Sequence, residues 1–321
     1  MTQENQMGLL YCMAVGDAYG GAFEYVKRDA KTPWKNDLFY HQHPTHLALL
    51  PGHYTDGVQM AIALAEMMLD PKVSLSHLDW ANYLVDTYLQ DPRVGYARGF
   101  STFLKNIGNG ANFLANIYPH SDKSGAAERA VVCGLIPDEQ AVIDRAMWQA
   151  SLTHATQDGM AAAACSALLV WGCRNGLNQD ELPQLLTQHF PNYPWGTPWT
   201  GFVDGKGLSA VRAALTVVQS SDMMADILQN AIELTGDVDG VAGIAMAAAG
   251  QHPDITNNLP ASLIRGLEND AYGREYLEKL DILLEKNYPR RVPKNQQDEP
   301  GQLESVLSMA ELLTSITEGE K

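Results

Sequence analysis

The most restrictive feature of this sequence is a run of small apolar residues that begins directly after two aspartates. Asp237 and Asp239 flank a single valine, and residues 240–250 are all glycine, alanine or larger apolar residues. A helix that is apolar on every side is buried, so the helix predicted here starts inside the molecule. Buried carboxylates need a partner, and a hard divalent cation suits oxygen ligands. The alternative is an ordinary helix start, with one aspartate as the cap and the other in the first turn.

A second stretch has the same plan. Thr55 and Asp56 come shortly before residues 61–69, which are almost entirely apolar. Thr55 as a simple helix cap is the alternative interpretation. Two such arrangements far apart in one chain favour a shared site over two unrelated caps. We therefore predict that Thr55, Asp56, Asp237 and Asp239 converge on a common cation.

The rest of the chain favours an all-α fold. Strand signals are scarce, because no apolar run alternates with period two and no Asn-Gly turn joins two such runs. In the first predicted helix, which ends near Gly20, the small residues Gly16 and Gly20 let another backbone approach closely. We expect one domain with a core over residues 7–288, followed by a linker and a terminal helix over 289–321. Further helices are predicted at 75–89, 160–173, 209–218, 223–234, 263–286 and 303–316, with long irregular segments at 27–51 and 191–207.

The charge of the chain excludes one class of partner. Lys and Arg number 22 against 38 Asp and Glu, which gives a net charge of -16. No cluster of basic residues stands out, so general nucleic-acid binding is not expected, because neutralising phosphates requires clustered cations. An anionic ligand would have to be held by local N–H groups, helix ends or a metal.

Cysteine usage and the N-terminus bear on the compartment. Cys12, Cys133, Cys165 and Cys173 lie among apolar neighbours without C-x-x-C spacing, which is typical of core residues in a reducing compartment. The first residues lack the basic and apolar regions of a signal peptide. The longest apolar run, residues 160–173, is shorter than the roughly 20 residues of a membrane span. We expect a soluble, cytoplasmic protein without a membrane partner; its oligomeric state stays open.

Several motifs, in order along the chain, resemble those of the ADP-ribosylglycohydrolases. This family includes dinitrogenase-reductase-activating glycohydrolase and the ADP-ribosyl-acceptor hydrolases, and the resemblance covers roughly residues 7–283. Each motif is weak alone, but the ordered set is specific. The motifs are Gly16-Asp17-Ala18-Tyr19-Gly20 with Glu24, Tyr54-Thr55-Asp56-Gly57, Ser124-Gly125-Ala126-Ala127-Glu128-Arg129, Thr153-His154 and Gly236-Asp237-Val238-Asp239-Gly240.

The resemblance implies a fold, a reaction and a set of roles. The fold would be a single-domain orthogonal helical bundle that holds one or two Mg²⁺ or Mn²⁺ ions in a cleft. Water would cleave the glycosidic bond between ADP-ribose, or a related ribosyl group, and a modified acceptor, with Glu24 or Asp56 handling the proton. The implied metal ligands are Thr55, Asp56, Asp237 and Asp239, and the implied substrate contacts are Gly99, Phe100, Ser124, Gly125, Ala126 and His154.

Two positions depart from the family pattern. Gly57 stands where a second aspartate is expected, and Gly240 stands where a Thr or Ser hydroxyl usually follows. Each change removes an oxygen ligand, so the chain is either an active hydrolase with a depleted metal site or a catalytically impaired protein that binds ADP-ribose or a nucleotide. A structural role is a third use that the composition permits. On this interpretation, Gly57→Asp with Gly240→Thr should tighten metal binding.

Overall fold

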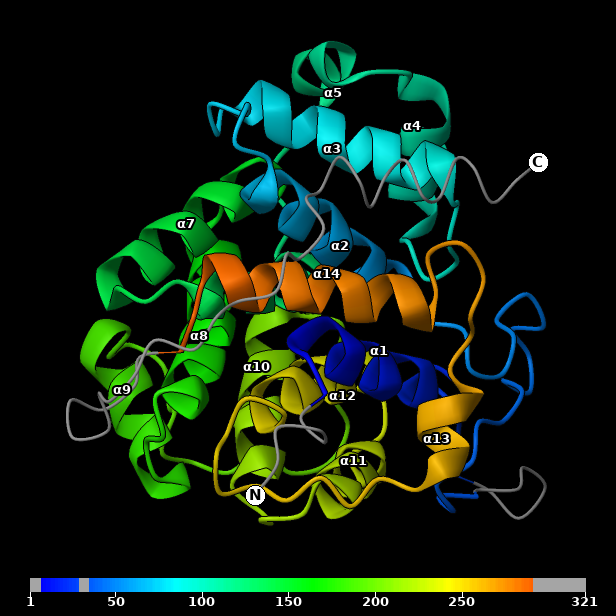
Figure 1. Cartoon of the computed structure of the whole chain (residues 1–321), viewed down its shortest axis with the longest axis vertical. Helices are drawn as coiled ribbons and strands as arrows, with labels where there is room; N and C mark the ends of the chain where they lie inside the picture. Colours follow the sequence, from blue (N-terminus) through cyan, green and yellow to red (C-terminus); the bar gives the residue numbers. More distant parts are fainter. Residues whose placement is uncertain (1–6, 29–34, 291–321) are drawn as a thin grey trace, which may run out of the picture.

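The computed structural model describes residues 7–28 and 35–290, and over these residues the protein is all-α (Figure 1). Fourteen α-helices and short 3-10 turns account for the regular structure of the described chain, which confirms the fold class. The helices are α1 Leu9–Gly20, α2 Asp56–Leu69, α3 His77–Gln90, α4 Arg98–Ile107, α5 Gly110–Asn116, α6 Gly125–Ala130, α7 Glu139–Ser151, α8 Gln157–Arg174, α9 Leu182–His189, α10 Gly207–Val218, α11 Met224–Glu233, α12 Val238–Ala249, α13 Ala261–Gly266 and α14 Arg274–Asn287.

Helix α12 is buried along its whole length, as its composition requires, and packs against α1 near the centre of the molecule (Figure 1). Glycines make this packing possible. A Cβ on Gly16 would overlap the carbonyl oxygen of Ala242, and one on Gly20 would lie 2.5 Å from the Cα of Asp239. The two backbones therefore touch, and the end of α1 lies beside the start of α12.

The loop before α12 is held in an uncommon conformation. Thr235 and Gly236 have φ angles of 66° and 92°, in the left-handed region. A Cβ on Gly236 would also overlap the carbonyl of Val203. That carbonyl accepts a hydrogen bond of 3.0 Å from the N–H of Asp237. Glycine at 236 thus allows the segment around Val203 to approach closely, and the hydrogen bond to Asp237 then holds the start of α12 in place.

The far end of α1 is tied to α14 by a buried carboxylate. Asp281 accepts hydrogen bonds from the backbone N–H groups of Leu10 and Tyr11, at 2.9 and 3.0 Å. These N–H groups belong to the first turn of α1, where a helix offers no partner of its own. Burial raises the pKa of Asp281 to about 7, against the lowering effect of the two hydrogen bonds.

This raised pKa predicts a stability that falls as the pH increases. Between about pH 4 and pH 7 the folded chain keeps a proton on Asp281 that the unfolded chain releases, so stability decreases by up to about 1.4 kcal/mol per pH unit. Asp281→Asn should abolish this component. Urea unfolding of both proteins across this window measures it, with Glu275→Gln on the exposed face of α14 as the control, because Glu275 is not among the charges that shift the pKa of Asp281. Parallel pH profiles for wild type and Asp281→Asn would contradict the prediction.

Some predicted boundaries are wrong. The segment 263–286 is not one helix, because α13 ends at Gly266 and α14 starts at Arg274. Between them Gly273 packs so closely that a Cβ there would lie 2.6 Å from the carbonyl oxygen of Glu268. Helices α4, α5, α6, α7 and α9 were not anticipated. The terminal helix predicted at 303–316 lies outside the described residues.

All four cysteines are buried and unpaired. Across the described residues, no helix combines the length and apolar character needed to cross a bilayer.

Candidate functional site

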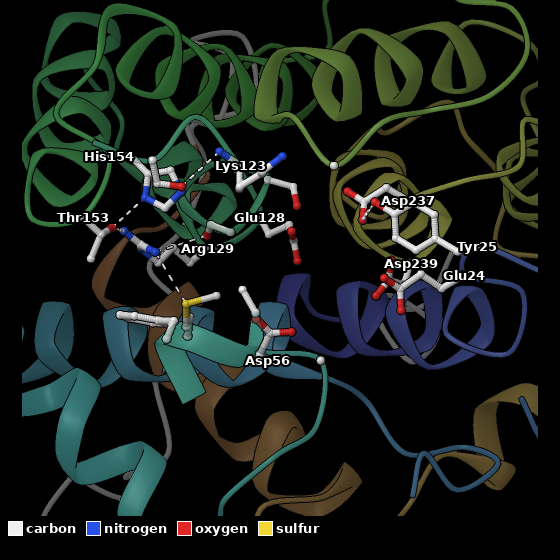
Figure 2. A pocket seen from close by; sticks show the side chains of 18 of the residues that line it. Glu24, Tyr25, Asp56, Lys123, Glu128, Arg129, Thr153, His154, Asp237 and Asp239 are labelled. Atoms are coloured by element: carbon white, nitrogen blue, oxygen red, sulfur yellow. Dashed lines mark hydrogen bonds between the residues drawn. The ribbon is translucent and has the colours of Figure 1, made fainter. Parts of the chain in front are cut away.

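A cavity of about 370 Å³ opens where α1, α2, α6 and α12 meet (Figure 2). Its lining has two chemically different ends. Figure 2 shows the carboxylates of Glu24, Asp237 and Asp239 toward one end and the nitrogen-bearing side chains of Lys123, Arg129 and His154 toward the other, with Asp56 and Glu128 between them. Such a cavity is large enough for a small-molecule ligand.

The acidic end brings together residues from opposite ends of the chain. Glu24, just after α1, offers a carboxylate oxygen that lies within 4.8 Å of carboxylate oxygens of Asp237 and Asp239 at the start of α12. Asp56, the first residue of α2, and Glu128 from α6 line the same cavity. The close packing of α1 on α12 is what makes this convergence possible.

Asp17 ties the start of α2 to α1 beneath this end. Its carboxylate accepts hydrogen bonds from the N–H and the hydroxyl of Thr55, at 2.6 and 2.8 Å. Burial raises the pKa of Asp17 to about 6, although these hydrogen bonds oppose the effect. The hydroxyl oxygen of Thr55 is thereby oriented, since its proton is committed to Asp17.

The carboxyl groups of the acidic end perturb one another. Burial, reinforced by the charges of Asp237 and Asp17, raises the pKa of Glu24 to about 7. The pKa of Asp56 is raised well above its ordinary value by burial and by repulsion from Asp17 and Glu24. Burial and repulsion from Glu24 and Asp237 do the same to the pKa of Asp239. So much negative charge in a buried place calls for a cation.

The donor set fits a divalent cation. Asp237 is 8% exposed, and its Oδ2 atom is buried without a hydrogen-bond partner. Its other oxygen accepts a bond of 3.3 Å from the Tyr25 hydroxyl. A buried carboxylate oxygen without a donor, beside Glu24 and Asp239, is what an oxygen-ligated Mg²⁺ or Mn²⁺ would require. Glu24, Asp237 and Asp239 therefore form an acidic group that could hold a metal ion.

At the opposite end a chain of hydrogen bonds orients a histidine. Arg129 Nη2 donates to the hydroxyl of Thr153 at 2.8 Å, and this hydroxyl lies 2.7 Å from His154 Nδ1. The hydroxyl already accepts from Arg129, so we infer that it donates its own proton to Nδ1 and that the imidazole proton is on Nε2. Burial, aided by the charge of Arg129, lowers the pKa of His154 to about 3, so the ring is neutral. Its buried Nε2 atom has no protein partner.

The loop before α6 completes the cavity. Lys123, Ser124 and Gly125 all line it. The Ser124 hydroxyl lies within hydrogen-bonding reach of the Glu128 and Asp237 carboxylates, which lowers the pKa of these groups, although burial outweighs this effect and both pKa values are raised. Isolated bridges pair Lys123 with Lys206 and His120 with His154, and these fix the loop against its neighbours.

The predicted site residues divide into two groups. Glu24, Asp56, Asp237, Asp239, Phe100, Ser124, Gly125 and His154 line one cavity. Three others do not line it. Thr55 lies under the cavity against Asp17, Ala126 is fully buried within α6, and a Cβ on Gly99 would meet nothing within 4 Å. Gly99 lies on the exposed side of α4, because the first turn of that helix turns it away from Phe100.

Sequence reasoning missed several residues that the structure brings to the site. Asp17 and Glu128 occur inside recognised motifs but were given no role. Arg129 and Tyr25 also line the cavity. The only available signal was charge: a Glu-Arg pair inside an alanine-rich segment has to find partners when it is buried.

Comparisons with known proteins identify the family and the fold. The sequence profile of the ADP-ribosylglycohydrolases matches residues 2–293. A solved structure titled "ADP-ribosylglycohydrolase-related protein complex" has a TM-score of 0.70 and 21% sequence identity, over 88% of this chain and 98% of that chain, a likeness that shows the fold. None of the curated proteins gives a significant match. Since the profile spans nearly the whole sequence, this chain belongs to the ADP-ribosylglycohydrolase family.

Proposed function

We propose that the protein is a metal-dependent hydrolase that cleaves the glycosidic bond between ADP-ribose and a modified acceptor. The observation that carries the proposal is the polarity of the cavity, with carboxylates at one end and hydrogen-bond donors at the other. Family membership supports glycohydrolase chemistry in general. A ligand with an anionic diphosphate and a ribose matches two such ends, because phosphates need donors and the reacting sugar needs charge stabilisation.

Asp56, Asp237 and Asp239 would hold the metal, with the Thr55 hydroxyl as a further oxygen. Bound Mg²⁺ or Mn²⁺ ions would polarise ribose hydroxyls and a water molecule at this end of the cavity. Asp17 would contribute indirectly, since it fixes the direction of the Thr55 hydroxyl.

Glu24 is positioned to accept the proton of the attacking water. Its carboxylate lines the cavity within 4.8 Å of the Asp237 and Asp239 carboxylates, and it follows the end of α1 rather than a helix start. A carboxylate there also stabilises positive charge that develops on the sugar. Asp56 is the second candidate for the proton, because it lines the same cavity.

The donor end would bind the rest of ADP-ribose. Ser124 and Gly125 face the cavity at the start of α6, and Phe100 closes one side. The chain carries a net charge of -16, so these local donors have to offset the charge of the ligand. His154 lines the same space, and its buried Nε2 atom would be the donor to the ligand.

His154 gives a specific prediction. His154→Leu should weaken ADP-ribose binding by about 10- to 100-fold, because a hydrogen bond to a charged acceptor contributes about 1.5–3 kcal/mol. His154→Gln should bind within a few-fold of wild type, since its amide nitrogen can replace the Nε2–H donor. Calorimetric titration with ADP-ribose measures both. Equal losses in the two variants would show that the donor is not what matters.

The proposed reaction is tested with a panel of ADP-ribosylated substrates that differ in linkage, including arginine, serine, nucleobase and small-metabolite acceptors. We expect release of ADP-ribose from at least one class, loss of release with EDTA and recovery with Mg²⁺ or Mn²⁺. ADP-ribose binding without metal dependence, and without release from any substrate, would instead support the catalytically impaired binding protein.

A further inference from the structure

The two glycines that depart from the family pattern face the same side chain. Gly57 lies in the first turn of α2 and Gly240 in the first turn of α12. A Cβ on Gly57 would overlap Glu128 Oε2. A Cβ on Gly240 would lie 3.1 Å from Glu128 Oε1 and 3.2 Å from its Cδ. The Glu128 carboxylate therefore occupies the space into which side chains at both positions would extend.

No cationic side chain of the described residues forms an ion pair with Glu128. Glu128 itself is 7% exposed. The neighbouring guanidinium of Arg129 is directed elsewhere, with Nε donating to Gln149 and Nη2 to Thr153. The carboxylates of Asp56, Asp237 and Asp17 are close enough to repel Glu128. The Ser124 hydroxyl and the charge of Arg129 act in the opposite direction, but neither forms an ion pair with it.

An unpaired carboxylate in such a place is costly. An ion-paired or metal-bound carboxylate can be buried, whereas an isolated one destabilises the folded state by several kcal/mol. An apolar side chain at position 128 would fill this alanine-rich segment without that cost. Glu128 is buried close enough to Asp237 for their charges to repel, and Asp237 Oδ2 has no hydrogen-bond partner, so a cation bound here would stabilise both carboxylates.

We infer that Glu128 is a metal ligand that replaces the oxygens missing at positions 57 and 240. The inference rests on the proposed function, since it assigns a residue to the same metal. One carboxylate from α6 supplies two oxygens at the point where α2 and α12 begin, and two glycines make room for it. With this assignment, the glycines at 57 and 240 change which residue supplies the metal-binding oxygens, and the site does not lose them.

This inference changes the outcome expected for the substitutions Gly57→Asp and Gly240→Thr. With Glu128 in place, the aspartate side chain introduced by Gly57→Asp would have to displace the Glu128 carboxylate, so no ligand is gained. The pair should therefore fail to tighten metal binding unless Glu128 is also removed.

The first test is calorimetric titration of the full chain with Mn²⁺ alone. Glu128→Gln should weaken Mn²⁺ binding at least tenfold, because even groups that only orient a ligand contribute about 10- to 100-fold. Glu66→Gln is the matched control, since Glu66 is also 7% exposed but bonds to Tyr276 away from the cavity. Wild-type affinity in Glu128→Gln would overturn the inference and leave the proposed function standing. Absence of Mn²⁺ binding by the wild type would overturn both.

The second test keeps the inference falsifiable if Glu128→Gln folds poorly. Gly57→Asp is compared in the wild-type background and in the Glu128→Ala background. We expect no gain, or a loss, in Mn²⁺ affinity in the first background and a gain of at least tenfold in the second. An equal effect of Gly57→Asp in the two backgrounds would show that the two side chains do not compete for one place, and would overturn the inference.

Discussion

Replacing Asp239 with asparagine is expected to lower turnover by about 10³-fold or more while stabilising the metal-free protein. The loss of turnover follows from the removal of a proposed ligand, and 10³-fold corresponds to about 4 kcal/mol of transition-state stabilisation. The gain in stability follows from repulsion, because Asp239 is buried beside Glu24 and Asp237. Without one of the three charges, unfolding of the metal-free protein at pH 8 should require more free energy, on the order of 1–2 kcal/mol.

The two effects are measured separately. ADP-ribose release in the presence of Mn²⁺ gives the first, and urea unfolding in EDTA gives the second. Asp281→Asn is the matched control for turnover, because Asp281 is also 8% exposed but lies at the other end of α1. Near-normal turnover of Asp239→Asn would contradict the metal assignment. A less stable metal-free variant would show that Asp239 is already compensated within the protein.

Replacing Arg129 with methionine is expected to lower the free energy of unfolding by about 3–5 kcal/mol and to disable the donor end. Arg129 is 1% exposed, and burial lowers its pKa to about 10, so the guanidinium is still charged at neutral pH. It donates to Gln149 Oε1 at 2.5 Å, to the Thr153 hydroxyl at 2.8 Å and to the Gly125 carbonyl at 3.3 Å. Methionine fills much of the volume but leaves these buried acceptors without donors, at about 1–3 kcal/mol each before relaxation.

Arg129 acts on the ligand through other residues, so its test needs a readout beyond stability. In Arg129→Met the Thr153 hydroxyl loses the donor that directs its proton toward His154. ¹⁵N NMR of the His154 ring should show the Nε2–H tautomer in the wild type and a mixture in the variant. Arg212→Met is the control, because Arg212 stacks on Trp199 at 5.0 Å away from the cavity. An unchanged tautomer would limit Arg129 to a structural role.

The sequence predicted well those features that depend on the composition of a single short segment. The alanine- and glycine-rich segment after Asp239 had to be a buried helix, and Gly16 and Gly20 had to face another backbone, as the packing of α1 on α12 confirms. The all-α class followed from the same patterns. Helix α5 escaped prediction because it is only seven residues long and buries just Gly110 and Phe113. Helix α4 was missed although Phe100, Phe103, Leu104 and Ile107 recur at helical spacing, because Gly99 in its first turn suggested a loop.

The position of Glu128 could not be predicted, because it depends on how helices α2, α6 and α12 pack together. When each motif is considered alone, Gly57 and Gly240 each appear to remove one oxygen ligand of the metal. Only the folded chain shows Glu128 in the space that both leave open. The spacing of residues 57, 128 and 240 along the sequence does not predict that they lie close together, because their proximity results from the packing of α2, α6 and α12.

The direct backbone contact between α1 and α12 determines when the metal-binding end of the cavity can form during synthesis. Glu24 emerges from the ribosome early, whereas Asp237 and Asp239 follow more than two hundred residues later. A nascent chain that does not yet include α12 can form helices but lacks the surface against which α1 packs. The cation-binding end of the pocket is therefore among the last parts to assemble during synthesis, and a chain truncated before residue 237 should retain helical signal yet take up no metal there.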